Sequence, residues 1–281
     1  MKRSIIFVSG FLCAFLVSLC VAEELPLWEA GLGFTGLSIP DYRGSNEQRD
    51  YLFPLPYIVY RGDILKLDRK GMRGLLFQSD RLELNISADG GVPVRSGRNS
   101  SRTNMPNLDP TLQIGPSLDV CLVRDCEADQ AVQIRFPIRA VMATATDLSR
   151  VSGIGFVINP QLNVDIKNIG SSRGWAFGFA LGPIFATEQY HDYYYQVTPQ
   201  YAIPDVRPSY DAKSGYSGTL LILAISKRFD HIWFGAFARY DELTGAIFAD
   251  SPLMKTKHSF MAGFGIAWVF GQSSRLVQAT Q

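Results

Sequence analysis

The sequence predicts an all-β fold, a closed antiparallel transmembrane β-barrel of about 12 strands, with about 10 strands as the alternative. Three observations lead to this prediction. Apolar and polar residues alternate along extended segments, and a period of two is typical of strands with one apolar face. Short polar links alternate with long ones, like the short periplasmic turns and long outer loops of these barrels. Beyond residue 22, no apolar run is long enough to cross a bilayer as a helix.

The start of the chain differs in composition from the rest. A positively charged start precedes an apolar run from Ile5 to Val21, and Cys20 to Ala22 has the small-x-small pattern of a signal peptidase site. We therefore expect residues 1–22 to be a cleaved signal peptide that directs export. An uncleaved membrane anchor is the alternative, and Leu19 is too bulky for lipoprotein processing at the cysteine that follows it.

Composition and charge exclude several classes of protein. Hydrophobic residues make up 47% and charged residues 19% of the chain, so it is neither disordered nor built from long apolar spans. The formal net charge is only +1, whereas nucleic-acid-binding proteins usually carry a strong excess of basic residues. No linker or internal repeat divides the chain, so we expect one barrel domain at 23–270 and a periplasmic C-terminal tail at 271–281.

Two cysteines, Cys121 and Cys126, lie beyond the predicted signal peptide. In an oxidising compartment, such a close pair can form a disulfide across a hairpin turn. A metal site would need two further soft ligands, which the sequence does not place nearby. We expect a local disulfide, with two free thiols as the alternative.

The length of the alternating segments distinguishes a soluble β-sandwich from a transmembrane β-barrel. A soluble sandwich also alternates, but its strands usually have about five or six residues, whereas strands that cross a bilayer need about nine to eleven. In the segment 155–167, Phe156 and Leu162 share one face, and Asn163 and Asp165 share the other. The clearest segments are 81–89, 111–123, 131–143 and 155–167.

The second half of the chain is richer in aromatic residues. The segments 174–188 and 258–270 place large aromatic residues on one face and mostly Gly or Ala on the other. Lipid accommodates large side chains, and a crowded barrel interior favours small ones. The segments 216–228 and 231–245 are less regular, and we expect them to be strands as well.

The links between strands predict the topology. Two periplasmic termini require an even number of strands, and counting back from the last segment yields about twelve. The count falls to about ten if residues 63–77 do not form two membrane strands. Short links are found at 78–80, 170–173 and 229–231, and long ones at 37–50, 90–110 and 188–215.

Charged residues recur on the predicted inner faces of the strands. Mixed charges inside a narrow barrel are expected to pair, because an unpaired charge in a confined space is costly. This predicts a mostly closed lumen or a slow path for small solutes. The residues expected to line the lumen are Arg81, Glu83, Asp89, Asp119, Arg135, Arg139, Asp165, Lys167, Arg239 and Asp241.

The stretch QYHDYYYQV, residues 189–197, begins the longest predicted outer loop. Tyrosines at this position are typical of the aromatic girdle, in which the ring lies in lipid and the hydroxyl lies among headgroups. His191 and Asp192 supply only two ligands, so a metal site is not favoured and no cofactor is expected. The predicted aromatic rim consists of Tyr190, Tyr193, Tyr194 and Tyr195.

The sequence contains no recognisable catalytic constellation. His258 and Ser259 are adjacent, so in a strand they point to opposite faces and cannot act as a pair. No Gly-rich phosphate loop, metal-spaced cluster or nucleophile elbow is present. We therefore do not expect an enzyme.

Several motifs are spread through the loops and strands of the chain. They are YRGS at 42–45, LPYIVYRGD at 55–63, NMPNLDPTLQIGP at 104–116, YHDYYYQV at 190–197, YSG at 216–218 and RYDELTGAIFADSPLM at 239–254. With these motifs the chain resembles the MltA-interacting protein family (MipA/OmpV) of outer-membrane proteins. The resemblance implies a barrel in the Gram-negative outer membrane, in contact with its lipid. For the founding member it also implies a scaffold that joins a murein hydrolase to a murein-synthesising penicillin-binding protein.

A scaffold needs periplasmic surface that a partner can reach. The candidates are the first residues of the mature chain, the turn at 121–130 and the tail from Gly271, which departs from the simplest outer-membrane pattern because it follows the last aromatic residue, Phe270. Two alternatives stay open at this point: a narrow channel for small solutes, and an outer-membrane protein with a structural or adhesive role.

Overall fold

The computed structural model describes residues 24–68, 71–123, 129–145, 147, 149–168 and 174–278. Within these ranges no helix is long and apolar enough to cross a membrane. Strands make up almost all of the regular structure. They are β1 (Glu24–Pro26), β2 (Trp28–Pro40), β3 (Gln48–Arg61), β4 (Leu65–Asp68), β5 (Gly71–Gln78), β6 (Leu82–Gly91), β7 (Thr111–Val123), β8 (Gln130–Thr144), β9 (Val151–Ile158), β10 (Gln161–Lys167), β11 (Trp175–Ala186), β12 (Gly215–Arg228), β13 (Ile232–Glu242), β14 (His258–Gln272) and β15 (Leu276–Gln278).

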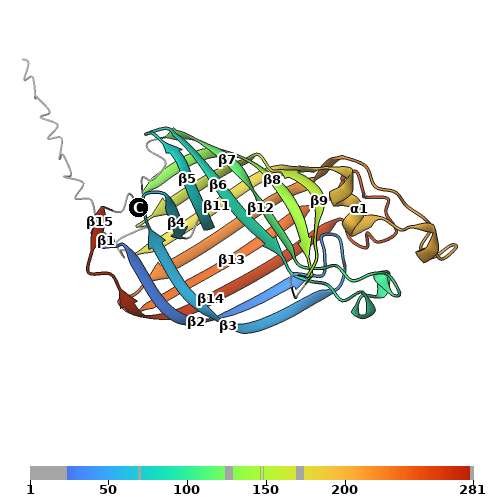
Figure 1. The fold of residues 1–281 in the computed structure, drawn as a ribbon, viewed down its shortest axis with the longest axis horizontal. Coiled ribbons are helices and arrows are strands. Elements are labelled where there is room, and N and C mark those ends of the chain that lie inside the picture. Colours follow the sequence, from blue (N-terminus) through green and yellow to red (C-terminus); the bar gives the residue numbers. More distant parts are fainter. Residues whose placement is uncertain are drawn as a thin grey trace, which may run out of the picture.

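The strands form a closed antiparallel barrel (Figure 1). Each strand from β2 to β8 pairs with the next, β11 to β14 do the same, and β14 pairs with β2. β9 and β10 lie end to end between β8 and β11, because both pair with β8 and both pair with β11. When β9 and β10 are counted as one strand, the barrel wall has 12 strands. This confirms the predicted number of about 12 over the alternative of about 10.

The break between β9 and β10 follows from local chemistry. Pro160 has no N–H to donate to a sheet, so the regular pairing stops there. The neighbouring Asn159 compensates, since its side-chain amide donates to the carbonyl of Pro183 over 2.8 Å. Gly182 is required beside this break, because a Cβ on it would lie 2.1 Å from the carbonyl oxygen of Pro160.

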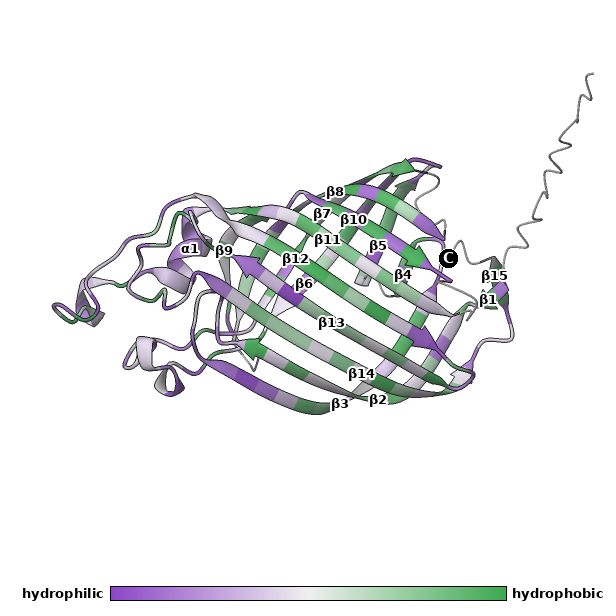
Figure 2. Ribbon diagram, turned by 180° about the vertical axis from the view of Figure 1, so that it is seen from behind, coloured by the Kyte–Doolittle hydropathy of each residue, from purple (hydrophilic) through white to green (hydrophobic). Residues whose placement is uncertain are grey.

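The outer surface of the barrel is apolar, as the alternation predicts. Hydrophobic and hydrophilic residues follow one another along its strands (Figure 2). Outward side chains such as Leu52, Leu32 and Trp268 are 73%, 63% and 62% exposed. Inward side chains such as Glu83 and Asp119 are each 1% exposed. Apolar side chains left open to solvent at this density would be unfavourable in water, and they suit the hydrocarbon of a bilayer.

The two ends of the barrel differ (Figure 1). One end carries short turns such as residues 229–231 between β12 and β13. The other carries long connections that contain the helix α1 (Glu188–Tyr195) and the short 3-10 helices η1 (Ser96–Arg98), η2 (Ser100–Arg102) and η3 (Pro199–Tyr201). The long connections are the predicted outer loops, and the short turns are the predicted periplasmic ones.

Both ends of the described chain meet at the short-turn end. β1 pairs with β15 in a separate antiparallel sheet, in which Leu25 lies opposite Val277. The last barrel strand, β14, continues to Gln272, two residues beyond the predicted boundary. The predicted tail therefore contains an ordered strand, while the predicted signal peptide lies outside the described residues.

Candidate functional site: the barrel lumen and the outer cap

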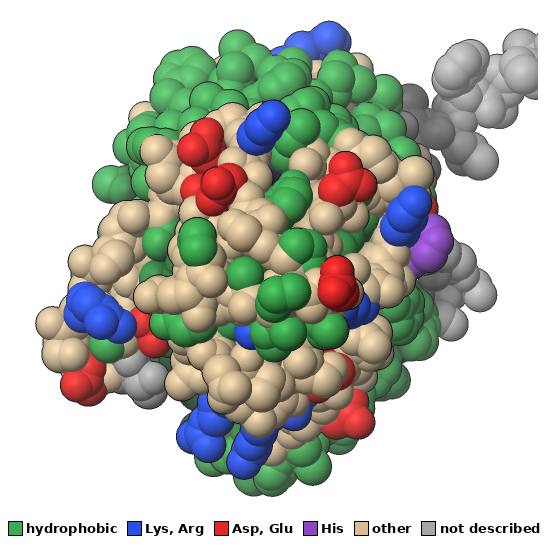
Figure 3. Space-filling view, turned by 90° about the vertical axis from the view of Figure 1, so that its right-hand side faces the viewer, with side chains coloured by type: hydrophobic (Ala, Val, Ile, Leu, Met, Phe, Trp, Pro, Cys, Tyr) green, Lys and Arg blue, Asp and Glu red, His purple; other side chains and the backbone are tan. Residues whose placement is uncertain are grey.

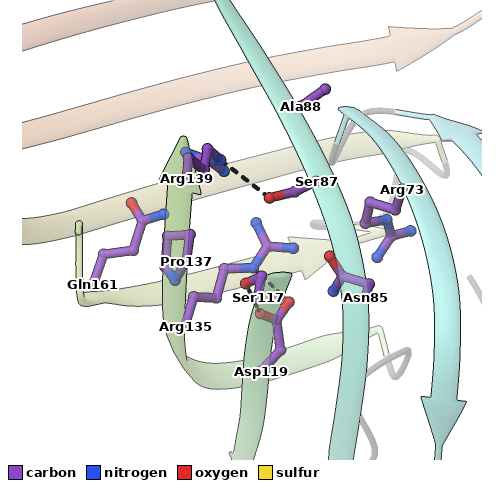
Figure 4. Close-up of a pocket in the computed structure, with 10 residues that line it drawn as sticks. All are labelled: Arg73, Asn85, Ser87, Ala88, Ser117, Asp119, Arg135, Pro137, Arg139 and Gln161. Carbon is purple, nitrogen blue, oxygen red and sulfur yellow. Dashed lines mark hydrogen bonds and ion pairs between the residues drawn. The ribbon is translucent and has the colours of Figure 1, made fainter. Parts of the chain in front are cut away.

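One half of the lumen is lined by paired charged groups from β5 to β8 (Figure 4). Arg73 Nη1 lies 3.2 Å from Glu83 Oε1, and both side chains are almost fully buried. Arg135 Nε donates to Asp119 Oδ2 over 2.8 Å, and Ser117 donates to the other carboxylate oxygen of Asp119 over 2.7 Å. Each buried carboxylate therefore has a cation and a neutral donor, which offsets the cost of removing the charge from water.

A small cavity lies within this polar half (Figure 4). Its volume is about 40 Å³, enough for one or two water molecules. Asn85 is 1% exposed, its amide donates to Glu83, and its Oδ1 has no hydrogen-bond partner among the described residues. The lining residues are Arg73, Asn85, Ser87, Ala88, Ser117, Asp119, Arg135, Pro137, Arg139 and Gln161.

Further ion pairs lie toward the two ends of the lumen. Near the outer loops, Asp241 accepts from Arg239 over 2.8 Å and from Arg43 over 2.9 Å. At the short-turn end, Glu29 lies 2.7 Å from Arg61 and 3.0 Å from Arg228. Cations outnumber the carboxylate in both groups, so each buried carboxylate is more than neutralised.

The opposite half of the lumen is aromatic. The rings of Tyr57 and Trp233, from β3 and β13, lie 5.5 Å apart. Glycines make room for these rings, since a Cβ on Gly235 would lie 2.4 Å from the Trp233 ring. A Cβ on Gly263 would lie 2.5 Å from Leu37 and 2.6 Å from the ring of Phe237. The sequence carries a signal for this half, because Trp233 and Phe237 alternate with small residues and precede Arg239 on the same face.

The outer end of the barrel is covered by a hydrophobic core made from four loops, which we call the outer cap. Its rings include Tyr195 and Phe248, stacked with centroids 3.7 Å apart and planes at 7°. Hydrogen bonds join the loops, because Tyr42 donates to the carbonyl of Leu253 over 2.8 Å and Ser251 donates to that of Tyr195 over 2.8 Å. Its buried members are Tyr42, Val94, Leu108, Tyr195, Val197, Leu243, Ala246, Phe248 and Leu253.

Two buried arginines connect the backbones of the cap loops. Arg102 is 3% exposed and donates to the carbonyl of Tyr194 over 2.9 Å. Arg207 is 6% exposed and donates to the carbonyls of Ser101 and Thr103 over 2.9 and 3.0 Å. A guanidinium has five N–H donors in a fixed fork, which suits it to hold several carbonyls at once.

The four tyrosines of the predicted aromatic rim lie in α1. Tyr193, Tyr194 and Tyr195 are part of the outer cap, whereas Tyr190 packs on a second buried cluster of barrel residues. Tyr195 is 2% exposed and Tyr193 and Tyr194 are partly buried. Tyr195 donates its hydroxyl to the carbonyl of Arg43 over 2.9 Å, and burial raises its pKa well above the ordinary value. This placement differs from the predicted lipid interface because the rings pack on residues of distant loops and on one another, rather than on lipid.

His191 lies on the buried side of the same helix. It is fully buried, its Nδ1 lies 2.6 Å from the carbonyl oxygen of Lys213, and its ring lies 5.0 Å from that of Phe248. Nδ1 carries the proton in this arrangement, because the carbonyl can only accept. Burial lowers the pKa of His191, so the neutral ring is the form that the cap accommodates.

The remaining residues predicted for the lumen occupy varied positions. Arg81 is exposed in the turn before β6, while Asp165 accepts from Gln133 over 3.2 Å and Lys167 is partly buried near the end of β10. Arg139 donates to Ser87 over 3.1 Å and lies 3.9 Å from Asp89.

Of the two cysteines of the predicted disulfide, only Cys121 is among the described residues. Cys121, at 2% exposure, is disulfide-bonded. Cys126 lies outside the described residues, so its pairing with Cys121 stays a prediction. Within the described ranges, no group of three His, Cys, Asp or Glu side chains could hold a metal ion.

The described loops fill the outer end of the molecule in a space-filling view (Figure 3). Polar side chains and backbone cover most of this face, and apolar side chains ring its edge. Together with the ion pairs of the lumen, the outer cap obstructs the barrel axis. The described residues thus place charged groups and aromatic rings side by side in the lumen, beneath loops that cover its outer end.

An antiparallel barrel with an apolar exterior, a charged interior and one elaborated end defines the class of outer-membrane β-barrel proteins. The family model described as "MltA-interacting protein MipA" matches residues 32–270. The chain belongs to this family, as its motifs predict, and it is a protein of the Gram-negative outer membrane.

Two relatives that match nearly the whole chain are named as outer-membrane proteins. The protein named "Putative outer membrane protein YiaT" of Escherichia coli (strain K12) is 25% identical over 267 residues, which cover 94% of this chain and 97% of the relative. The protein of the same name from Escherichia coli O157:H7 has the same identity and coverage. Among solved structures, the Ralstonia pickettii toluene transporter TbuX matches with a TM-score of 0.25 and 12% identity, over 89% of this chain and 70% of that chain.

Proposed function

We propose that this protein is a non-conducting outer-membrane barrel that serves as a scaffold for murein enzymes at its periplasmic end. The obstruction of the barrel axis carries the proposal. Arg135 and Asp119 pair within the lumen, and Tyr195 stacks on Phe248 in the outer cap. A barrel obstructed in both places is better suited to anchor other proteins than to pass solutes.

The sheet of β1 and β15 supports a role at the periplasmic end. Among the described residues, each of these strands pairs only with the other, so each keeps one edge to which a partner strand could add. Leu276 is 51% exposed there, which provides apolar contact area. Two of the three predicted periplasmic candidates, the start of the mature chain and the tail, are thereby combined in one surface.

The chemistry of the partner comes from the family. The family description names MltA as a partner, and the resemblance implies a murein hydrolase together with a penicillin-binding protein. A protein embedded in the outer membrane and exposed to the periplasm would hold both enzymes close to the murein layer. We assign the protein no catalytic activity of its own in this role.

Crosslinking in intact envelopes tests the scaffold. A chain that ends at Gln272 lacks β15, and we expect it to lose crosslinks to murein hydrolases and penicillin-binding proteins. Val206→Asp, at a residue 70% exposed in an outer loop, is the matched control and should keep them. Heat-modifiable mobility on a gel verifies that both barrels are folded. Equal capture of the murein enzymes by both variants would refute a scaffold at this sheet.

An assay for catalysis tests the last part of the proposal. His258 and Ser259 lie on opposite faces, with His258 exposed and Ser259 4% exposed, so they do not form a nucleophile and base. We expect purified protein to release no fatty acid from phospholipid and no fragments from murein. Turnover that disappears in Ser259→Ala would contradict the assignment.

A further inference from the structure

The barrel wall has a gap on one side of β3. β4 has four residues and pairs with β3 only at Tyr60 and Arg61. Four residues extend about 13 Å, less than half of a hydrocarbon core of about 30 Å. Among the described residues, β3 from Gln48 to Val59 therefore pairs with β2 alone.

The backbone of β3 is adapted to this unpaired edge. Arg61 donates its N–H to Leu27 beside β2, whereas Gly62 donates to Leu65 at the start of β4. Because successive residues of a strand donate to opposite sides, even-numbered residues of β3 direct their backbone groups away from β2. Pro54 and Pro56 are both even-numbered and have no N–H to leave unsatisfied. Prolines in this orientation are typical of strand edges.

The gap has defined borders, and we call it the lateral window. β3 lies on one side and β6 on the other, the β4–β5 hairpin lies toward the periplasm (Figure 1), and cap loops lie toward the outside. These loops are joined across the window, because Arg49 donates to the carbonyl of Arg98 over 2.6 Å and Asn99 donates to Asp41 over 2.8 Å. The outer end is thus fixed in place, while above the β4–β5 hairpin no strand pairing among the described residues joins β3 to β6.

The window connects lipid with an interior that has two chemical halves. The inward-facing Phe53 lies on β3 at the window and is 37% exposed, although a residue facing a filled lumen would be buried. Tyr57 and Trp233 continue this aromatic half. On the other side, β6 borders the window beyond Ser87, the last residue that it pairs with β5. Two residues before Ser87, β6 carries Asn85, whose buried Oδ1 lacks a partner, into the polar cavity beside Arg139.

We propose that the lateral window and the lumen behind it form a binding site for a single-chain amphiphile that enters from the outer membrane. Its apolar chain would contact Phe53 and Trp233, which are already shaped for large apolar groups. Its head, a hydroxyl or a carboxylate, would accept from the arginines of the cavity, and a hydroxyl would in addition donate to Asn85 Oδ1. The outer cap prevents entry along the axis, so the bilayer is the source of the ligand. This site does not depend on the scaffold function.

Tryptophan fluorescence distinguishes the two sides of the wall. Trp233 faces the lumen, whereas Trp268 is 62% exposed on the lipid face. One variant keeps only Trp233 (Trp28→Phe, Trp175→Phe, Trp268→Phe), and its control keeps only Trp268. Both are folded into phospholipid vesicles, checked by heat-modifiable mobility, and titrated with 12-bromododecanoic acid, whose bromine quenches nearby tryptophan. We expect saturable quenching of Trp233 and non-saturable quenching of Trp268.

A second pair of variants tests the window itself. Phe53→Ser, in the background that keeps Trp233, should weaken the saturable quenching about tenfold, because the chain loses an apolar contact. Leu52→Ser alters the adjacent residue, which lies on the lipid face, and should leave the saturable quenching of Trp233 unchanged. Non-saturable quenching of Trp233, or equal effects of the two substitutions, would overturn the proposal.

A different occupant of the gap would also overturn it. A second copy of the chain could pair with the free edge of β3. In that case Ile58→Cys, placed on this strand at a residue 54% exposed, would yield a disulfide-linked dimer on oxidation in vesicles, and Trp233 would not respond to the brominated acid. Monomeric Ile58→Cys protein with saturable quenching supports the amphiphile site.

Discussion

At the scale of single residues, the carboxylates inside this barrel are buried beside arginines that balance their charge. Glu83, Asp119 and Asp241 each have an arginine within 3.2 Å. Their inward position could be predicted from the two-residue period alone, because the period is a local property of a strand. Their particular partners could not, since a cation on the neighbouring strand and a cation two strands away are equally compatible with the period.

Asp119 offers the sharpest test of the buried network. Asp119→Ala leaves the partly buried Arg135 without its carboxylate. Breaking a fully buried pair costs about 3–5 kcal/mol of folding free energy, and because Arg135 is partly exposed we expect a loss of about 2–3 kcal/mol. Urea unfolding followed by tryptophan fluorescence measures the loss. The control Asp230→Ala changes an exposed aspartate in a periplasmic turn and should stay within about 0.5 kcal/mol. Equal stability of the two variants would mean that the Arg135 pair contributes little.

His191 makes the outer cap sensitive to pH. Because burial lowers its folded pKa, the unfolded loop binds the proton more readily, and the His191 contribution is complete above about pH 6.5 and declines as the pH falls below it. Protection of residues 188–214 against hydrogen exchange should therefore fall between pH 7.5 and pH 5.5. Asp192, whose pKa is raised by burial, acts in the opposite direction at lower pH. His191→Gln should flatten the fall, and an unchanged slope in this variant would exclude His191 as its cause.

At the scale of elements, the strands were predictable and the helix was not. Thr111–Val123 forms a strand with the predicted bounds, because its alternation is continuous. The helix Glu188–Tyr195 is short and rich in tyrosine, which has only modest helix propensity. It forms because its rings pack on the outer cap, and one stabilising hydrogen bond of that cap, from Tyr42 to Leu253, joins residues 211 positions apart.

Tyr195 tests how much α1 contributes to the outer cap. Tyr195→Ala removes a buried ring that stacks on Phe248, and such deletions cost about 3–5 kcal/mol. Tyr195→Phe removes only the hydrogen bond to the Arg43 carbonyl, at a cost of about 1 kcal/mol. The rate at which a protease cuts the outer loops of folded barrels measures the loss of cap stability in both variants. If Tyr195→Ala were no more sensitive to protease than Tyr195→Phe, the stacking would not hold the cap together.

Strand packing has a test of its own at Gly115. A Cβ on Gly115 would lie 2.0 Å from the carbonyl oxygen of Ile138, so Gly115→Ala should separate β7 from β8 and cost about 1–3 kcal/mol. Gly153→Ala is the matched control, because a Cβ there meets nothing within 4 Å. Urea midpoints measure both, and a stable Gly115→Ala barrel would show that β7 and β8 can move apart at little cost.

At the scale of the whole molecule, the barrel is obstructed along its axis and open at one side. The number of strands could be predicted from the alternation of short and long links. The lateral window could not, because its cause is the length of one element, β4, and its pairing with β3 at only two residue pairs. The sequence does carry a trace of it in Pro54 and Pro56, which fit an unpaired edge better than the interior of a sheet.

The central claim, that this outer-membrane barrel does not conduct along its axis, is tested most directly by recording from single proteins in planar bilayers. Buried ion pairs in the lumen and a packed outer cap predict no stable open level at neutral pH, with protein whose folding has been verified by heat-modifiable mobility. Tyr195→Ala, which loosens the cap, should add at most brief openings because the lumen pairs remain. A large and stable conductance from the unaltered protein would contradict the account.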